Sequence, residues 1–259
     1  MILTFDLGNS DLVVGAFKDD DLVAIVRQNT DIYRSVDEYF YTIEKLLVSK
    51  KVDLDEITGA IISSVVPQLT RVMQAVARRF LKGNEALVLA PGIKTGLKIR
   101  TDNPSEVGAD LIADCVGAMA KYSLPLIVVD LGTASKILAV DKNGAFIGCA
   151  ILPGVKIATE ALVRGTAQLP FINYQLPKKV IGTNTMDCMN SGIVYGFASL
   201  VDGMILRFEK EIGQKCDRII TGGFATTIAP ACNEEIIIDR DVLLYGLNEI
   251  YFRNLKGKE

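Results

Sequence analysis

The sequence contains one short pattern twice, near its N-terminus and again near its middle. Each copy is an apolar run that ends in Asp-Leu-Gly and small polar residues, at residues 2–10 and 127–135. The copies are separated by close to half of the 259 residues, and a second apolar segment follows each. A strand, a tight turn at glycine and a second strand account for this pattern. We therefore predict an internal duplication that gives two similar lobes.

The residues at these turns suit phosphate binding. Glycine lets backbone N–H groups come close to an anion, and hydroxyl or amide side chains add further donors. Asp6 and Asp130 stand where the strands end, so each carboxylate can hold a cation, directly or through water. A β-hairpin without a ligand explains one copy equally well. Two copies, each opening one half, favour the phosphate-binding interpretation.

Composition excludes several kinds of chemistry. The chain has no histidine, which removes Ser-His-Asp catalysis, phosphohistidine intermediates and imidazole metal ligands. A general base must then be a carboxylate, Lys, Tyr or Cys. The five cysteines are odd in number and contain no Cys-x-x-Cys pair, so the sequence suggests neither a disulfide framework nor a zinc site.

Charge and hydropathy bear on partners and location. With 28 basic and 31 acidic residues, the chain lacks the basic excess typical of nucleic-acid binders, and we expect no nucleic-acid partner. Apolar residues make up 49% of the chain, yet no apolar run approaches the roughly 18 residues that span a membrane. No basic region precedes an apolar segment after Met1. We expect a soluble cytoplasmic protein without a membrane partner.

Periodicity predicts alternating strands and helices in both halves, hence an α/β fold with mixed sheets. Ser35 begins a helix with a capping-box pattern, and a long helix is expected from Thr185 to about Ile212. We place the lobe boundary between residues 122 and 123. The expected strands are 12–17, 22–26, 60–65, 86–89, 126–131, 134–140, 145–152, 218–221 and 235–238, and the other helices are 69–82, a helix from 103, 154–162 and one from about 242.

The segment after Asn103 contains an acidic series. Asn103-Pro104 is a typical helix start, and Glu106, Asp110 and Asp114 then follow at i, i+4 spacing. A solvated acidic stripe explains this series. The alternative is a substrate site, in which Gly108-Ala109 lets a substrate come close to Asp110.

Two further glycine patterns leave alternatives open. The strand that ends at Gly222-Gly223 suits either the close approach of an adenosine or a simple β-turn. In the long helix, Gly192, Gly196, Ser199 and Gly203 form a small-residue ridge that permits close helix packing within the chain or across a dimer.

The motifs, taken in order, resemble those of a known family. With two similar halves and paired Asp-x-Gly turns, the chain resembles the actin, sugar-kinase and heat-shock ATPase superfamily. Within it, the chain resembles type III pantothenate kinases over essentially its whole length. The motifs that carry this resemblance are residues 6–10, 108–110, 130–134, 182–185, 191–192 with 195–196, and 221–223.

The resemblance implies a fold, a reaction and its cofactors. The fold would be two duplicated actin-like, ribonuclease H-like lobes with ATP in the cleft between them, and the protein a homodimer. The reaction would be ATP-dependent phosphorylation of pantothenate to 4′-phosphopantothenate, the first step of coenzyme A biosynthesis. The cofactors would be ATP, Mg²⁺ and a monovalent cation, K⁺ or NH₄⁺.

The resemblance also assigns roles to residues. Asp110 would be the general base, Asp130 would bind the monovalent cation, and Asp6 would hold Mg²⁺ through ATP. The pantothenate site would be lined by Gly108, Ala109, Asp110, Leu111 and Thr185. The resemblance and the strands that end in glycine together give the expected nucleotide-binding residues. These are Asp6, Leu7, Gly8, Asn9, Ser10, Asp11, Leu12, Val13, Gly132, Thr133, Gly222 and Gly223.

The chain departs from the family pattern at a few positions. Thr101 stands where Tyr is usual, Leu111 where Arg is common, Asp114 where Asn is usual, and Ser135-Lys136 replaces a Thr-Thr pair. Two other functions are therefore weighed against the kinase. One is a non-catalytic or substrate-shifted nucleotide-binding regulator of the same fold, and the other is an actin-like filament protein.

Overall fold

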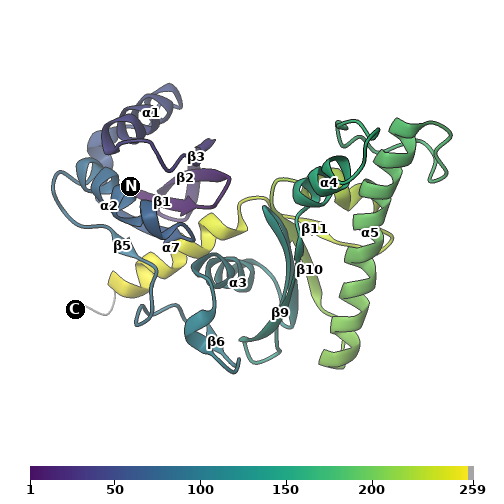
Figure 1. Ribbon diagram of the computed structural model, residues 1–259. Coiled ribbons are helices and arrows are strands. Elements are labelled where there is room, and N and C mark those ends of the chain that lie inside the picture. The colour runs from purple at the N-terminus through teal and green to yellow at the C-terminus, as the bar shows by residue number, and fades with distance from the viewer. Residues whose placement is uncertain (256–259) are drawn as a thin grey trace. The chain divides into compact units, whose positions relative to one another are not determined.

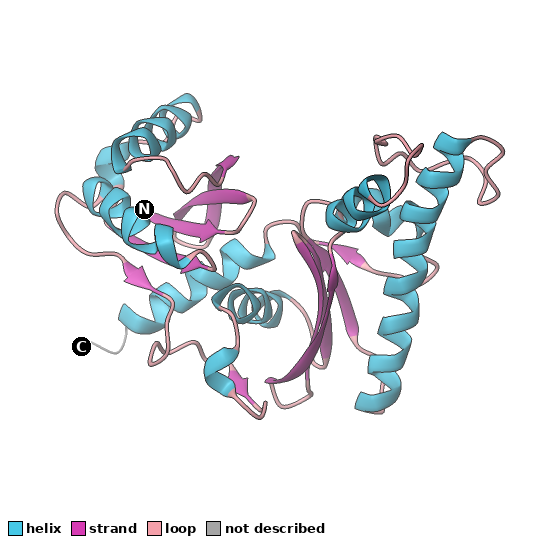
Figure 2. Cartoon of the chain, in the orientation of Figure 1, coloured by secondary structure: helices cyan, strands magenta, loops and turns pink. Residues whose placement is uncertain are grey.

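The computed structural model describes residues 1–255, which form two compact units (Figure 1). The first unit contains residues 1–97 and 102–120 together with the chain from residue 242, and the second contains residues 98–101 and 121–241. Each unit has its own mixed sheet with helices against it (Figure 2). The fold is α/β with mixed sheets, as periodicity predicts, and the two units agree with the two lobes that the resemblance implies.

The sheet of the first unit has the strand order β3-β2-β1-β4-β5. Strand β1 is antiparallel to β2 and parallel to β4, so the N-terminal hairpin lies at the centre of the sheet. The strands are β1 (Ile2–Leu7), β2 (Asp11–Lys18), β3 (Asp21–Asn29), β4 (Gly59–Ser64) and β5 (Leu87–Val88).

The sheet of the second unit has the order β11-β10-β7-β8-β9-β6. Read from β9 to β11, five of its strands repeat the order and directions of the first sheet, which confirms the predicted duplication. The edge strand β6 is an addition that the sequence pattern did not predict. The strands are β6 (Lys98–Ile99), β7 (Leu126–Leu131), β8 (Ala134–Val140), β9 (Ala145–Pro153), β10 (Asp217–Thr221) and β11 (Ile237–Ile238).

The first sheet is covered by helices on both faces. Leu3, Phe5 and Leu7 point to one face, where they pack with residues of α1 (Val36–Ser49) and α2 (Pro67–Phe80). Ile2 points to the other face and packs with Leu244 of α7 (Val242–Leu255). Because α7 packs on this face, the last helix of the chain belongs to the first unit, whereas the boundary expected from sequence assigned it to the second lobe.

The second sheet packs against α5 (Thr185–Ile212), which lies along one face (Figure 1). Residues Ile127, Val129 and Leu131 of β7 contact the buried side of this helix. Among the described residues, α5 alone is long and apolar enough to cross a membrane, but 56% of its most apolar window is buried inside the structure, as in a core helix. The unit also contains α4 (Val155–Arg164) and α6 (Ala225–Ile228).

The start of α3 differs from the prediction. Residues Pro104–Glu106 form a separate 3-10 turn, Asn103 makes no side-chain cap, and α3 (Ala109–Lys121) begins only after Gly108. Glu106, Asp110 and Asp114 therefore do not share one helix face. Asp114 is also buried, with 1% of its surface exposed, which excludes a solvated acidic stripe. Two further 3-10 turns are Leu54–Glu56 and Ala229–Ala231.

Candidate active site

The turn between β1 and β2 is fixed by hydrogen bonds to its backbone. Gly8 N–H donates to Asp11 O at 3.0 Å, and the Thr30 hydroxyl donates to Gly8 O at 2.7 Å. Thr30 N–H also donates to Ser10 O at 2.9 Å. Asn9, Ser10 and Asp11 remain exposed, so their polar groups face outward from a fixed turn. Such a turn can present donors to a phosphate without first having to become ordered.

The apolar members of the predicted nucleotide set have a different position. Leu7 and Leu12 are fully buried in the core, and Val13 is 7% exposed and packs toward α7. Their side chains therefore build the hairpin, and only their backbone can meet a ligand. Asp6, at the end of β1, is partly buried.

Asp110 lies in the first turn of α3, and its carboxylate lies close to Gly108. Leu111 N–H donates to Asp110 Oδ1 at 2.9 Å, which orients the carboxylate. A Cβ atom at Gly108 would lie 2.5 Å from the same oxygen, so a side chain there would displace it. Leu111 itself is 8% exposed, and its side chain packs inward.

Helix α7 packs against both β1, which carries Asp6, and α3, which carries Asp110. A Cβ atom at Gly117 would lie 1.9 Å from Val242 O, and one at Gly246 would lie 1.9 Å from Ala113 O. Glycine at both positions thus allows α3 and α7 to meet backbone to backbone. The strand of Asp6 and the helix of Asp110 therefore both pack against α7.

In the second unit, Asp130 at the end of β7 has a cationic partner from the neighbouring strand. Lys136 Nζ lies 2.7 Å from Asp130 Oδ2, and only 15% and 13% of these side chains are exposed. A monovalent cation was expected at Asp130. The residues present do not fit that ion, because the lysine ammonium already lies against the carboxylate.

Three glycines pack tightly around the Asp130 turn. Gly222 has φ +89°, and a Cβ atom there would lie 2.5 Å from the Leu131 carbonyl carbon and 2.7 Å from Asp130 Oδ1. At Gly132 it would lie 3.2 Å from that oxygen, and at Gly154 it would lie 2.1 Å from Thr133 O. Gly223 has no atom within 4 Å of its Cβ position, and Thr133 is exposed. The two predicted glycine turns therefore meet in one place.

Sequence reasoning did not identify Gly154 or the partner of Lys136. The sequence pattern places Gly154 at the start of the helix expected over 154–162 and gives no sign of its close approach to Thr133 O. The Lys136 pairing follows from counting the register of the hairpin, in which Lys136 is the Cα partner of Asp130.

The predicted substrate residue Thr185 is exposed at the start of α5. Asn184 caps this helix by accepting from Asp187 N–H at 2.9 Å, and its amide donates to the Asp187 carboxylate at 2.7 Å. A Cβ atom at Gly182 would lie 2.5 Å from Cys188 N, so the preceding loop packs directly on the first turn. The loop is also tied to α5 by hydrogen bonds from Ser191 to Val180 O and from Tyr195 to Pro177 O.

The predicted site residues thus form two groups. The first unit holds residues 6–13 and 108–111, and the second holds Asp130, Gly132, Thr133, Thr185, Gly222 and Gly223. Partial burial raises the pKa of the Cys216 thiol to about 11 and that of the Cys232 thiol to about 12, so neither thiol is suited to act as a base near neutral pH.

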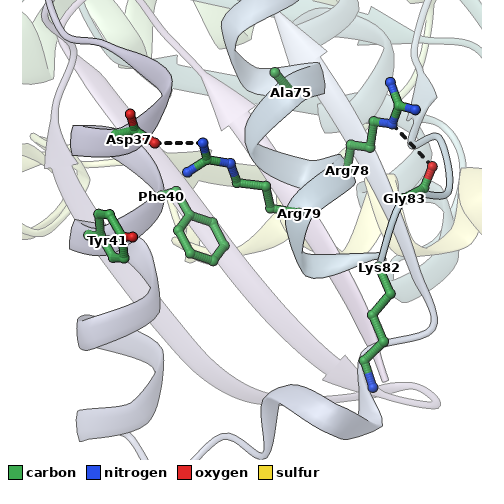
Figure 3. A pocket seen from close by; sticks show the side chains of 8 residues that line it. All are labelled: Asp37, Phe40, Tyr41, Ala75, Arg78, Arg79, Lys82 and Gly83. Atoms are coloured by element: carbon green, nitrogen blue, oxygen red, sulfur yellow. Dashed lines mark hydrogen bonds and ion pairs between the residues drawn. The ribbon is translucent and has the colours of Figure 1, made fainter.

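A hollow of about 660 Å³ lies elsewhere in the first unit, between α1 and α2 (Figure 3). Arg79 forms an ion pair with Asp37 across it at 2.5 Å, and Arg78 Nε donates to Gly83 O at 3.1 Å. None of the predicted site residues lines it. Its lining is Asp37, Phe40, Tyr41, Ala75, Arg78, Arg79, Lys82 and Gly83.

Comparisons with known proteins give a consistent result. The sequence model of the family described as type III pantothenate kinase matches residues 2–207. The type III pantothenate kinase of Moorella thermoacetica is 41% identical over 98% of this chain and 100% of its own length. The type III pantothenate kinase of Acholeplasma laidlawii is 40% identical over 99% of this chain and 100% of its own length. Among solved structures, an activator of 2-hydroxyisocaproyl-CoA dehydratase from Clostridium difficile with bound ADPNP has a TM-score of 0.55 at 15% identity, covering 99% of this chain and 96% of that one.

Proposed function

This chain belongs to the type III pantothenate kinase family, and we propose that it carries out that family's reaction with Asp110 as the general base. The reaction is ATP-dependent phosphorylation of pantothenate to 4′-phosphopantothenate, which begins coenzyme A biosynthesis. We also propose roles for individual residues, binding of Mg²⁺ with ATP, a homodimer and a cytoplasmic location.

The position of Asp110 carries the assignment of the base. Its carboxylate is oriented by Leu111 N–H and is approached closely by the unsubstituted backbone of Gly108. In a chain without histidine, a carboxylate in this position is suited to take a proton from an alcohol. Asp110 accepts the proton of pantothenate's primary hydroxyl, the alkoxide oxygen forms a bond to the γ-phosphorus of ATP, and the bond to ADP breaks.

Phosphoryl transfer depends mostly on positioning and on neutralising charge. We assign the ATP phosphates to the fixed turn of residues 8–11, with Asp6 at its strand end. An aspartate at this turn fits Mg²⁺, which takes one or two carboxylates and completes its shell with phosphate oxygens and water. When bound, Mg²⁺ offsets the negative charge of the phosphates. Thr133, Gly132, Gly222 and Gly223 contact the nucleotide in this assignment.

Pantothenate is assigned to Gly108, Ala109 and Thr185, with Leu111 contributing through its backbone because its side chain is buried. The expected monovalent cation has no role in this mechanism, since Lys136 already balances the charge of Asp130.

We further propose that the protein acts as a homodimer in the cytoplasm, without nucleic-acid or membrane partners. The small-residue positions Gly192, Gly196 and Ser199 are exposed on α5, which supports packing of this ridge against a second copy. A net charge of −3 gives no electrostatic attraction to nucleic acid.

A coupled ADP-release assay with ATP and Mg²⁺ tests the proposed function. Pantothenate is compared with other small primary alcohols and with no acceptor. Pantothenate-dependent ADP release supports the kinase. ADPNP binding without turnover of any alcohol favours the regulator instead, and ATP-dependent sedimentation favours the filament protein.

A further inference from the structure

The Lys136–Asp130 pair is built into the sheet. The two residues are Cα partners on adjacent antiparallel strands, so their side chains project from the same face. The ammonium and carboxylate are 2.7 Å apart and mostly buried. Ser135, the preceding residue, lies on the opposite face of β8 and is 1% exposed, so it is no ligand beside Asp130.

The duplicated hairpin of the first unit differs at this point. There the Cα partner of Asp6 is Val13, an apolar residue that packs toward α7. The register of the sheet thus places a lysine opposite one strand-end aspartate and a valine opposite the other. The two carboxylates are therefore equipped for different tasks, although the turns that follow them are alike.

We propose that the Lys136 ammonium permanently takes the place of a monovalent cation at Asp130, so that this chain binds nucleotide and turns over without K⁺ or NH₄⁺. A second cation at Asp130 would have to lie beside a fixed positive charge, and like charges at such distances in a partly buried site repel strongly. The ammonium also supplies donors that can face a nucleotide phosphate from the Gly132 turn. The part of this proposal that concerns turnover rests on the proposed function, whereas the part that concerns nucleotide binding does not.

The test measures ADPNP binding by calorimetry with Mg²⁺, at equal ionic strength in choline, Na⁺, K⁺ or NH₄⁺ chloride. We expect the wild-type Kd to agree within twofold in all four salts. In Lys136→Thr the carboxylate lacks its ammonium, and we expect a Kd at least tenfold weaker in choline that K⁺ or NH₄⁺ largely restores. Lys142→Thr, which removes an exposed lysine from the next turn, should behave as wild type in every salt.

A wild-type Kd that weakens tenfold or more in choline overturns the proposal by itself, so the test does not depend on whether Lys136→Thr folds. A folded Lys136→Thr that is indifferent to K⁺ also contradicts it. Pantothenate turnover is then measured in the same salts. Salt-independent ADPNP binding without phosphorylation in any salt would contradict the proposed function while supporting this inference. A wild-type enzyme that needs K⁺ for turnover would support the proposed function and contradict this inference.

Discussion

Gly108 and Asp110 are matched in space: a Cβ atom at position 108 would lie 2.5 Å from Asp110 Oδ1. The carboxylate lies where any larger residue at 108 would force it away. Gly108 directly precedes α3, which begins at Ala109, so the position without a side chain adjoins the helix turn that carries Asp110.

Gly108→Ala should therefore impair catalysis more than folding. A shift of the carboxylate by about 1 Å is enough to cost up to about a hundredfold in rate. We expect kcat to fall about 10- to 100-fold, with ADPNP affinity little changed, in steady-state kinetics and calorimetry. Ser105→Ala, a small change at an exposed position of the same loop, is the control and should leave kcat unchanged. Equal kcat in the two variants would show that Asp110 tolerates displacement.

Gly222 should be intolerant of any side chain for two reasons. Its φ of +89° is unfavourable for other residues, and a Cβ atom would lie 2.5 Å from the Leu131 carbonyl carbon. Gly213, which ends α5, has a similar φ of +87°, but a Cβ atom there would have no other atom within 4 Å. We expect Gly213→Ala to cost about 1 kcal/mol in urea denaturation, the strain of the left-handed conformation alone. Gly222→Ala should cost clearly more, and equal losses would mean that the close packing around Asp130 relaxes without penalty.

Local patterns predicted much of this fold. The paired Asp-Leu-Gly hairpins, the capping box at Ser35 and the full extent of α5 follow from short-range periodicity and caps. The break at Gly108 was missed because Asn103-Pro104 is a good helix start in isolation, although Asn103 makes no side-chain cap in the structure. The place of α7 depends on Gly117 and Gly246, which are far apart in sequence. The ion pair of Lys136 requires the strand register, which periodicity leaves undefined.

A buried ion pair joins α5 to β10 in the second unit. Arg218 binds Glu209 through two hydrogen bonds of 2.9 and 2.8 Å, and about a tenth of each side chain is exposed. Arg218 also pairs with Glu234 at 2.5 Å, so it keeps one carboxylate partner when Glu209 is removed and loses the two hydrogen bonds to Glu209. Glu209→Ala should therefore lower the free energy of unfolding by about 2 kcal/mol, the range of lost hydrogen bonds to a charged group. Glu160→Ala, which removes exposed i, i+4 pairs on α4, is the control and should cost no more than about 0.5 kcal/mol in the same denaturation.

The same pair should make stability depend on acid pH. The hydrogen bonds from Arg218 lower the pKa of Glu209 below its usual 4.5, against the opposing effect of burial. Because the folded-state pKa is the lower one, this contribution is complete above the unfolded pKa and disappears as pH falls through the folded value. In denaturation between pH 3 and 7, Glu209→Gln should lose less stability on acidification than wild type. A slope equal to that of wild type would exclude Glu209 as a source.

Product formation by wild type and by Asp110→Asn tests most directly whether this chain phosphorylates pantothenate with Asp110 as its base. Mass spectrometry after incubation with ATP, Mg²⁺ and pantothenate detects phosphopantothenate, and calorimetry with ADPNP reports whether the variant still binds nucleotide. We predict that wild type forms the product and that Asp110→Asn forms it about 10²- to 10⁴-fold more slowly, the range of a lost general base, with ADPNP affinity retained. Phosphopantothenate formed at the wild-type rate by Asp110→Asn would contradict the role of Asp110, and its absence from wild type that binds ADPNP would contradict the reaction.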